Sequence, residues 1–283
     1  MRVIIGTSGY SYRDWLGQFY PSGLRPNELL PYYASQFPAV EINTSYYGIP
    51  SAATTAKWAS QVPLGFEFAV KAHQDMTHAD DFQPEVFAQF RDAIQPLQRA
   101  RMLGAVLAQF PWRFRPGPES ERYLKALRGE LPDVPVVVEF RHAGWAAERT
   151  FELLRELELG YCCVDEPRFK SLMPPLVTAT SNVGYLRFHG RNYQQWWKGD
   201  AKERYDYRYT ESELAEWLPK VVQLAEATEK TYVFFNNHNE GNAGQNARQL
   251  ALLIEQMTPK VRLAAPPEVT PIQGSLLEVA RAA

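Results

Sequence analysis

Ionisable side chains stand at alternate positions in several short apolar stretches of the chain. Glu139 and Arg141 form one such set, and Tyr185, Arg187 and His189 form another. Because successive side chains of a β-strand point to opposite faces, each set is predicted to lie on one face of a strand. Charged groups buried on such a face are costly unless they are paired or used in chemistry. The pattern therefore indicates either an active site or a buried network of ion pairs.

His189 is the first candidate for proton transfer, because imidazole titrates near neutral pH and this residue closes an apolar stretch. Glu139 and Asp165 end neighbouring stretches and are candidates to orient the imidazole or to act as a second acid or base. Lys71 stands among apolar neighbours, where burial would lower its pKa toward use as a base or a Schiff-base amine. Two structural alternatives stay open: a satisfied histidine bonded to Glu139 or Asp165, and a lysine that only forms a salt bridge.

Other polar and aromatic residues near the same stretches are suited to hold a small, oxygen-rich or anionic ligand. Guanidinium groups bind carboxylate or phosphate through two parallel hydrogen bonds, amides supply neutral donors and acceptors, and aromatic rings stack on sugars or bases. The predicted ligand-binding residues are Glu41, Asn43, Tyr47, Gln109, Arg141, Trp145, Arg187 and Asn237. The structural alternative is that pairs such as Glu41 with Arg187, or Glu139 with Arg141, merely plug the protein interior.

A divalent metal ion is a weaker interpretation of the same residues. Oxygen and nitrogen ligands are available from Glu41, Glu139, Asp165, His189 and His238. However, no H-x-H or H-E-x-x-H spacing occurs, and the nearby arginines and lysine would repel a cation. We therefore predict no metal site, and the sequence identifies no cofactor.

Eight apolar stretches must position these groups. The expected strands cover Val3–Thr7, Ala39–Thr44, Phe66–Lys71, Gly104–Gln109, Pro135–Arg141, Gly160–Asp165, Val183–His189 and Thr231–Asn237. They are rich in Val, Ile, Phe and Tyr, which is typical of buried parallel strands, and each is expected to be followed by a helix. Such alternation favours an α/β fold, a (β/α)8 TIM barrel of eight parallel strands with outer helices. In that fold the active site lies at the carboxyl ends of the strands.

Helical spacing of apolar residues between these stretches supports the same architecture. It occurs from 87 to 97, from 151 to 157 and from 247 to 257. Thr210 and Glu213 predict a capping box that opens one helix carrying Trp217 and Val221. The segment from Arg191 to Tyr209 is long for a loop after a strand and is crowded with Tyr, Trp, Lys and Arg. We expect it to be a mobile lid over the site, the alternative being a solvated insertion.

Composition bounds the class of protein. The 283 residues are expected to form one barrel domain, 1–258, followed by a partly disordered appendage rich in Pro and Ala, 259–283. A net charge of −2 disfavours nucleic acid and anionic membranes as partners. The only cysteines, Cys162 and Cys163, are adjacent, which excludes a disulfide framework. With neither a signal peptide nor a long apolar segment, we expect a soluble cytoplasmic protein, its oligomeric state open.

An ordered series of short segments gives the chain a family resemblance. The series includes Gly6-Thr-Ser-Gly-Tyr10, Val40-Glu-Ile-Asn43, Leu107-Ala-Gln-Phe-Pro111, Val138-Glu-Phe-Arg141, Arg187-Phe-His-Gly-Arg191 and Phe234-Phe-Asn-Asn237. On these segments, over most of Arg2 to Met257, the chain resembles the DUF72 (YecE-like) family of (β/α)8-barrel proteins. The resemblance implies the barrel fold and carries no agreed activity, cofactor or substrate. It departs from the family pattern at His238, where an acidic residue is common, so no carboxylate ligand is expected there.

The function predicted from these residues is a small-molecule enzyme with acid–base chemistry on a polar, sugar-like or phosphorylated substrate. One alternative is a metal-assisted hydrolase or nuclease acting on nucleic acid, motivated by the basic and aromatic loop. The other is a non-catalytic protein that binds or senses a ligand. Strongly salt-dependent binding to nucleic acid would favour the first alternative, and tight ligand binding without product would favour the second.

Overall fold

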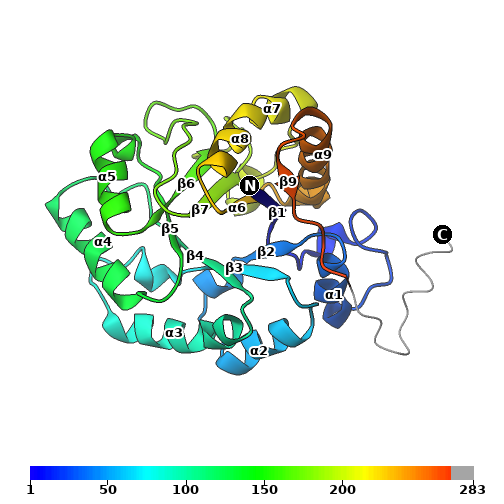
Figure 1. Ribbon diagram of the computed structural model, residues 1–283, viewed down its shortest axis with the longest axis horizontal. Helices are drawn as coiled ribbons and strands as arrows, with labels where there is room; N and C mark the ends of the chain where they lie inside the picture. Colours follow the sequence, from blue (N-terminus) through cyan, green and yellow to red (C-terminus); the bar gives the residue numbers. More distant parts are fainter. Residues whose placement is uncertain (269–283) are drawn as a thin grey trace.

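A closed barrel of eight parallel strands forms the centre of the computed structural model, which describes residues 1–268 (Figure 1). The strands are β1 (Arg2–Ser8), β2 (Ala39–Ile42), β3 (Glu67–Lys71), β4 (Leu103–Gln109), β5 (Val136–Glu139), β6 (Gly160–Asp165), β7 (Val183–Phe188) and β8 (Lys230–Phe235). Each strand pairs with the next, and β1 pairs with both β8 and β2, which closes the barrel. The predicted TIM-barrel fold is confirmed.

Helices surround the barrel on its outer side (Figure 1). They are α1 (Leu29–Ala34), α2 (Ala52–Ser60), α3 (Pro84–Arg99), α4 (Pro118–Glu130), α5 (Glu148–Glu156), α6 (Ala201–Arg204), α7 (Glu211–Ala215), α8 (Leu218–Glu226) and α9 (Asn242–Met257). In the described part of the chain, no helix is both long and apolar enough to cross a membrane. The connection from β6 to β7, residues 166–182, contains no helix, so the expectation of a helix after every strand is wrong there.

The predicted helix after Thr210 is interrupted. Its capping box with Glu213 is present, but α7 ends at Ala215 and α8 begins at Leu218. Pro219 lies in the first turn of α8. Proline lacks an N–H group and its ring would crowd the carbonyl group of Ala215, which favours a break between the two helices.

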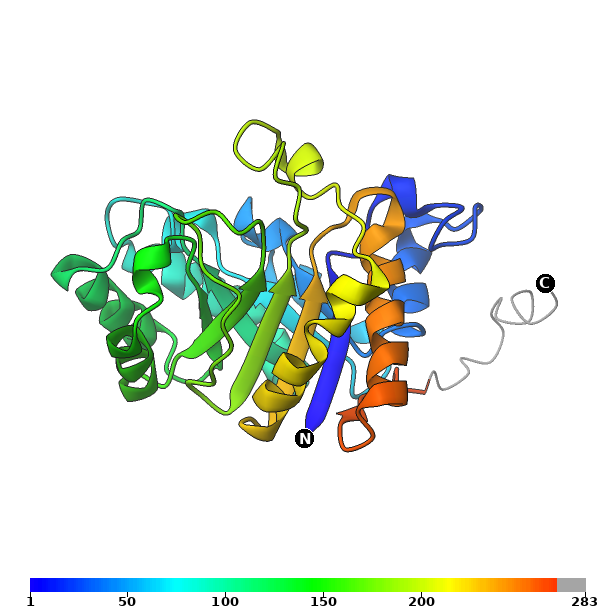
Figure 2. The same ribbon diagram turned by 90° about the horizontal axis from the view of Figure 1, so that it is seen from above.

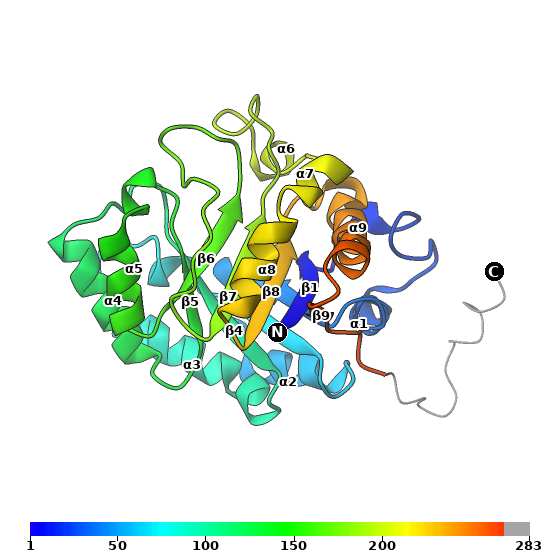
Figure 3. The same cartoon turned by 45° about the horizontal axis from the view of Figure 1, so that its top comes forward.

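A two-residue strand, β9 (Arg262–Leu263), lies beside the start of β1 (Figure 3). β2 pairs with β1 from Gly6 onward, which leaves the first residues of β1 with an open edge. The Ala264 N–H donates to the Val3 carbonyl oxygen across this edge, at 2.8 Å. This contact belongs to the predicted appendage, of which residues 269–283 lie outside the described part of the chain.

The two ends of the barrel interior carry different polar groups. At the amino end, Glu67 accepts from Arg2, Lys230 and the Tyr232 hydroxyl, which makes a compact structural plug. At the carboxyl end, alternation of side chains along β2, β5 and β7 directs a second and larger set of charged groups inward. The carboxyl end of the barrel is therefore the end with the larger set of inward-facing ionisable side chains.

Candidate active site

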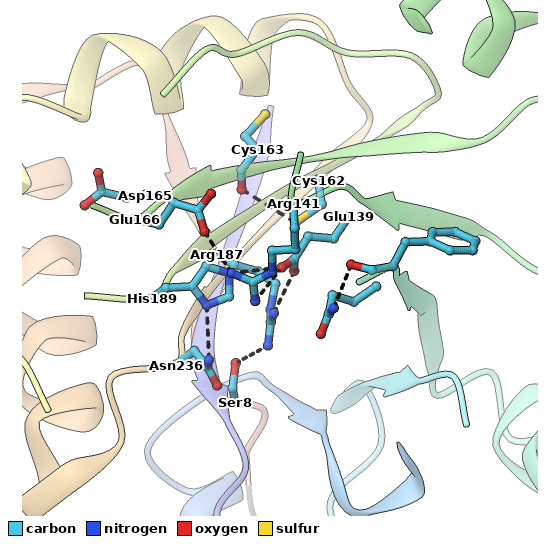
Figure 4. Close-up of polar contacts among 12 residues, drawn as sticks. Ser8, Glu139, Arg141, Cys162, Cys163, Asp165, Glu166, Arg187, His189 and Asn236 are labelled. Carbon is cyan, nitrogen blue, oxygen red and sulfur yellow. Dashed lines mark hydrogen bonds and ion pairs between the residues drawn. The ribbon is translucent and has the colours of Figure 1, made fainter. Parts of the chain in front are cut away.

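Arg187 of β7 is the centre of a buried network at the carboxyl end of the barrel (Figure 4). Its guanidinium group donates to both carboxylate oxygens of Glu41, at 2.7 and 3.0 Å, and to Glu139 Oε2 at 2.6 Å. The Tyr185 hydroxyl donates to Glu41 Oε2 at 2.7 Å. The planar guanidinium group thus ties β2 and β5 to β7 across the barrel.

Glu139 is a permanent anion in this network. Arg141 approaches its Oε1 atom at 2.9 Å while Arg187 holds Oε2. Burial alone would raise the pKa of Glu139, but Arg141 and Arg187 outweigh it and hold the pKa well below its usual range. A carboxylate that stays ionised at neutral pH anchors its cationic neighbours and takes up no proton. Both ion pairs that the sequence left as structural alternatives are present.

His189 is locked in one neutral form. Its side chain is completely buried, with Nε2 3.1 Å from Glu139 Oε1 and Nδ1 3.1 Å from the Asn236 amide nitrogen (Figure 4). Because Glu139 can only accept, Nε2 carries the hydrogen and Nδ1 accepts from Asn236. Burial, followed by Arg141, lowers the pKa of His189 to about 3. This geometry fits the structural alternative of a satisfied histidine better than a proton shuttle.

Asp165 does not join His189, which corrects the sequence prediction. Side chains alternate along β6, and Cys162 points inward, with its sulfur 3.8 Å from Glu139 Oε2. Asp165 therefore points away from the cluster (Figure 4), and Arg191 Nε donates to its two oxygens at 2.9 and 3.2 Å. Burial raises the pKa of Asp165, although Arg191 opposes the rise. The ion pair between Asp165 and Arg191 connects the barrel to the segment that follows β7.

Glu166 supplies the carboxylate that Asp165 does not, and the sequence prediction missed it. Its Oε2 atom accepts from Arg141 at 2.8 Å (Figure 4), and its Oε1 atom is buried with no hydrogen-bond partner among the described residues. Burial raises the pKa of Glu166 to about 7, with Arg141 opposing the rise and Glu139 adding to it. Extending the alternation from Cys162 through Val164 would have found this residue.

We expect Glu166→Gln to stabilise the protein at alkaline pH. The pKa of Glu166 is raised from 4.5 to about 7 in the fold, so its favourable contribution is complete below about pH 4.5 and is lost as the pH rises through about 7. Above that pH, the variant should gain on the order of 3 kcal/mol over wild type, and almost nothing near pH 4. Urea unfolding across this range measures it; an equal effect at both ends would show that Glu166 does not titrate abnormally.

Lys71 lies at the end of β3 and has no anionic partner in the described part of the chain. Its Nζ atom donates to Gln109 Oε1 at 2.8 Å and lies 4.2 Å from the centre of the Tyr46 ring. Within residues 1–268 no carboxylate forms an ion pair with it, so the salt-bridge alternative is not realised there. Burial, with Arg187 next in size and Arg141 adding, lowers the pKa of Lys71 to about 7, although Glu139 and Glu41 oppose the fall.

Asn237 faces away from the cluster, which corrects its predicted role in ligand binding. Its amide nitrogen donates to the Tyr207 carbonyl oxygen and to Asn246 Oδ1, both at 2.9 Å. The preceding residue, Asn236, points inward and meets His189. Because neighbouring side chains point to opposite sides, Asn236 contacts His189 inside the barrel and Asn237 contacts the Tyr207 backbone outside it.

Trp145 is also displaced from its predicted role. Its side chain is buried on the outer side of the barrel, stacked on Phe140 with ring centres 4.2 Å apart. Its ring N–H donates to the Phe114 carbonyl oxygen at 2.8 Å. Because Phe140 alternates with Glu139 and Arg141, this stack lies on the opposite face from the charged cluster. Trp145 is a packing residue.

Two further predicted ligand residues, Asn43 and Tyr47, follow β2 at the carboxyl end of the barrel. Asn43 follows β2, and its Oδ1 atom is buried without a hydrogen-bond partner in the described residues. Tyr47 lies four residues later and is 74% exposed. An unpartnered buried acceptor and an exposed aromatic ring are both available to a ligand.

The segment from Arg191 to Tyr209 projects beyond the carboxyl ends of the strands (Figure 2). Trp196 of this segment is buried, with its ring centre 5.9 Å from the Arg141 guanidinium carbon and 6.4 Å from the His189 ring centre. The Tyr205 ring lies 5.8 Å from the same imidazole. The Asn192 side chain fastens the segment by donating to the Glu203 and Asp206 carbonyl oxygens. The segment forms a roof over the cluster, and its motion stays a prediction.

Other places in the described chain offer less chemistry. Residues 1–268 contain no group of three or more His, Cys, Asp or Glu side chains able to hold a metal ion. His238 stacks on Tyr12 with ring centres 4.6 Å apart, and burial lowers its pKa. An open hollow of about 380 Å³ lies outside the cluster, lined partly by Asp80, Arg113 and Tyr123. The strand-end cluster is therefore the stronger candidate site.

Comparisons with known proteins agree with one another. A family model described as a protein of unknown function, DUF72, matches residues 4–271. The UPF0759 protein YunF of Bacillus subtilis (strain 168) is 32% identical over 270 residues, which cover 89% of this chain and 95% of that protein. The crystal structure of a DUF72 family protein from Thermotoga maritima MSB8 superposes with a TM-score of 0.84 at 38% identity, covering 90% of this chain and all of the other. A DUF72 family protein from Enterococcus faecalis V583 gives 0.81 at 28% identity, covering 89% and 95%.

Proposed function

The chain belongs to the DUF72 family, and from that premise we propose that it is an enzyme that moves protons on a small polar or anionic substrate at the strand-end cluster. One observation carries this proposal. Within residues 1–268, Lys71 has no carboxylate partner and Glu166 keeps one buried oxygen without a hydrogen-bond partner, and burial brings the pKa of each to about 7. A base and an acid that both titrate near neutral pH are what acid–base catalysis requires.

The proposed catalytic roles of Lys71 and Glu166 follow from the protonation state of each that can exchange a proton with a substrate. Uncharged Lys71 is the base, and protonated Glu166 is the acid. Arg141 contacts Glu166 and lowers the pKa of Lys71, so it lies within electrostatic reach of both and is suited to hold an anionic substrate group. Gln109 supplies a neutral polar atom beside Lys71, and Asn43, which follows β2, offers another at the same end of the barrel. Glu139, Arg187 and His189 position this set and do not exchange protons at neutral pH.

The other functions considered for this sequence receive less support. A nuclease would need a surface that attracts phosphates, whereas the net charge is −2 and the cluster lies beneath the buried Trp196. A sensor needs a ligand site but no titrating pair. Two groups brought to the same pKa from opposite directions favour catalysis over simple binding.

The test is proton exchange in heavy water. The purified protein is incubated near pH 7 with hydroxy aldehydes, hydroxy ketones, hydroxy acids and their phosphate esters, and exchange of C–H for C–D is followed by NMR. We expect exchange with at least one compound, slowed on the order of 100-fold or more in Lys71→Met and Glu166→Gln. Lys57→Met on α2 and Glu156→Gln on α5 are exposed controls that should exchange as wild type does.

Two results would contradict the proposal. Exchange with none of the compounds, while some of them raise the melting temperature, would assign the site to ligand binding instead. Exchange that persists at the wild-type rate in both Lys71→Met and Glu166→Gln would move the chemistry away from this pair.

A further inference from the structure

The amine of Lys71 is placed for more than proton transfer. The Gln109 amide oxygen accepts one hydrogen of the amine, and the face of the Tyr46 ring lies against it. Gln109 is neutral and accepts from the uncharged amine as well as from the ammonium ion, so the contact fixes the direction of the nitrogen without forcing it to be charged. No carboxylate in residues 1–268 forms an ion pair that would hold the amine as a cation.

Lys71 is also accessible. The first four residues of β3 are buried, whereas Lys71 keeps part of its surface exposed. It lies at the carboxyl end of a barrel strand, with Tyr46 on the short helical turn after β2 and exposed Tyr47 next to it. Lys71 is thus more exposed than Arg187 and His189, which are both buried, so its amine is the more accessible group to a small molecule from solvent.

From this geometry we propose that Lys71 is a nucleophile that forms a Schiff base with a small aldehyde or ketone carrying hydroxyl or anionic groups. The inference rests on the proposed function and names its substrate class. Arg141, whose charge acts on Lys71, and the Asn43 amide oxygen, which has no hydrogen-bond partner among the described residues, are available to bind the polar groups of such a substrate. Tyr46 offers its ring face to the cation that the reaction creates.

The covalent step balances with the groups present. The uncharged Nζ attacks the carbonyl carbon, a C–N bond forms, and a proton moves from nitrogen to the former carbonyl oxygen to give a neutral carbinolamine. The Glu166 carboxyl group then donates its proton to the hydroxyl, which leaves as water. The products are a cationic iminium on Lys71 and the Glu166 carboxylate. The iminium acidifies the adjacent C–H bond, which links this step to the proton exchange above.

Both starting forms are populated at neutral pH. With pKa values of about 7, roughly half of Lys71 is uncharged and half of Glu166 is protonated there. An ordinary exposed lysine is uncharged to about one part in a thousand at that pH. Lys71 should therefore react with carbonyl compounds well ahead of the other lysines of the chain.

The experiment traps the adduct by reduction. The protein is incubated near pH 7 with glycolaldehyde and sodium cyanoborohydride, and each lysine's labelling rate is read by peptide mass spectrometry. We expect Lys71 to be labelled at least about 10-fold faster than exposed Lys57, since its uncharged fraction is far larger. Lys71→Met should abolish the fast adduct, Glu166→Gln should slow it, and Lys57→Met should leave it unchanged.

Formaldehyde is the second probe, because it is small enough to exclude restricted entry as a reason for failure. Labelling of Lys71 no faster than Lys57 with both probes would overturn the inference. If deuterium exchange still depends on Lys71 in that case, the proposed acid–base function stands and Lys71 acts only as a base. A fast adduct without any exchange would support the nucleophile and overturn the proton-transfer function.

Discussion

Replacing Arg187 by methionine is expected to lower the free energy of unfolding by about 3–5 kcal/mol. The guanidinium group is 2% exposed and binds both Glu41 and Glu139, each of them fully buried. Its removal leaves two carboxylates in the barrel with too few partners, and uncompensated buried charge is strongly destabilising. Urea unfolding of both proteins near neutral pH measures it.

Arg155→Met is the matched control for Arg187→Met. Arg155 pairs with Glu148 on the exposed face of α5, at 2.8 Å, and such surface pairs contribute less than about 1 kcal/mol. Combining Glu41→Gln with Arg187→Met should recover part of the stability, since one of the stranded charges is then neutral. A loss of less than about 1 kcal/mol in the free energy of unfolding for Arg187→Met alone would show that the buried network contributes little to the stability of the barrel.

Replacing Lys71 by methionine is expected to stabilise the protein while it removes the reactive amine. The fold lowers the pKa of Lys71 from 10.5 to about 7. Its contribution to stability is therefore complete above about pH 10.5, decreases as the pH falls, and is fully lost below about pH 7. Below pH 7 the variant should exceed wild type by several kcal/mol, with about 5 kcal/mol as the upper limit.

Lys57→Met serves as the control for this measurement because Lys57 is exposed on α2. Its stability relative to wild type should not change between about pH 6 and about pH 10. A Lys71→Met variant that is less stable than wild type below pH 7 would contradict the account. It would mean that the contacts of Lys71 with Gln109 and Tyr46 stabilise more than its buried charge costs.

The barrel and half of the cluster are predictable from the sequence because both depend on local alternation. A strand that reads Val-Val-Glu139-Phe-Arg141 must present its charges on one face, and the same is true of Tyr185, Arg187 and His189. The errors come from the two strands where alternation was not applied. Directly after β6 the inward carboxylate is Glu166, one residue beyond the predicted Asp165. Directly after β8 the inward amide is Asn236, one residue before the predicted Asn237.

Other features depend on contacts that no local pattern encodes. His189 closes its strand as predicted, yet its role is decided by Glu139 and Asn236, which come from two other strands. The state of Lys71 likewise depends on Gln109 from the next strand and on Arg187 from across the barrel. Trp145 follows a polar strand end, but its ring turns outward because Phe140 offers a stacking surface there.

The most direct test of the central claim is an NMR titration of Lys71, with lysine labelled at the carbon next to the amine and Lys71→Met used to assign its signal. We expect the wild-type signal of Lys71 to titrate with a midpoint of about pH 7. In Glu166→Gln the midpoint should stay within about one unit of that value, because burial and Arg187 set the pKa of Lys71. A midpoint near that of exposed lysines, about 10.4, would contradict the account, because the site would then hold an ordinary cation in place of a base.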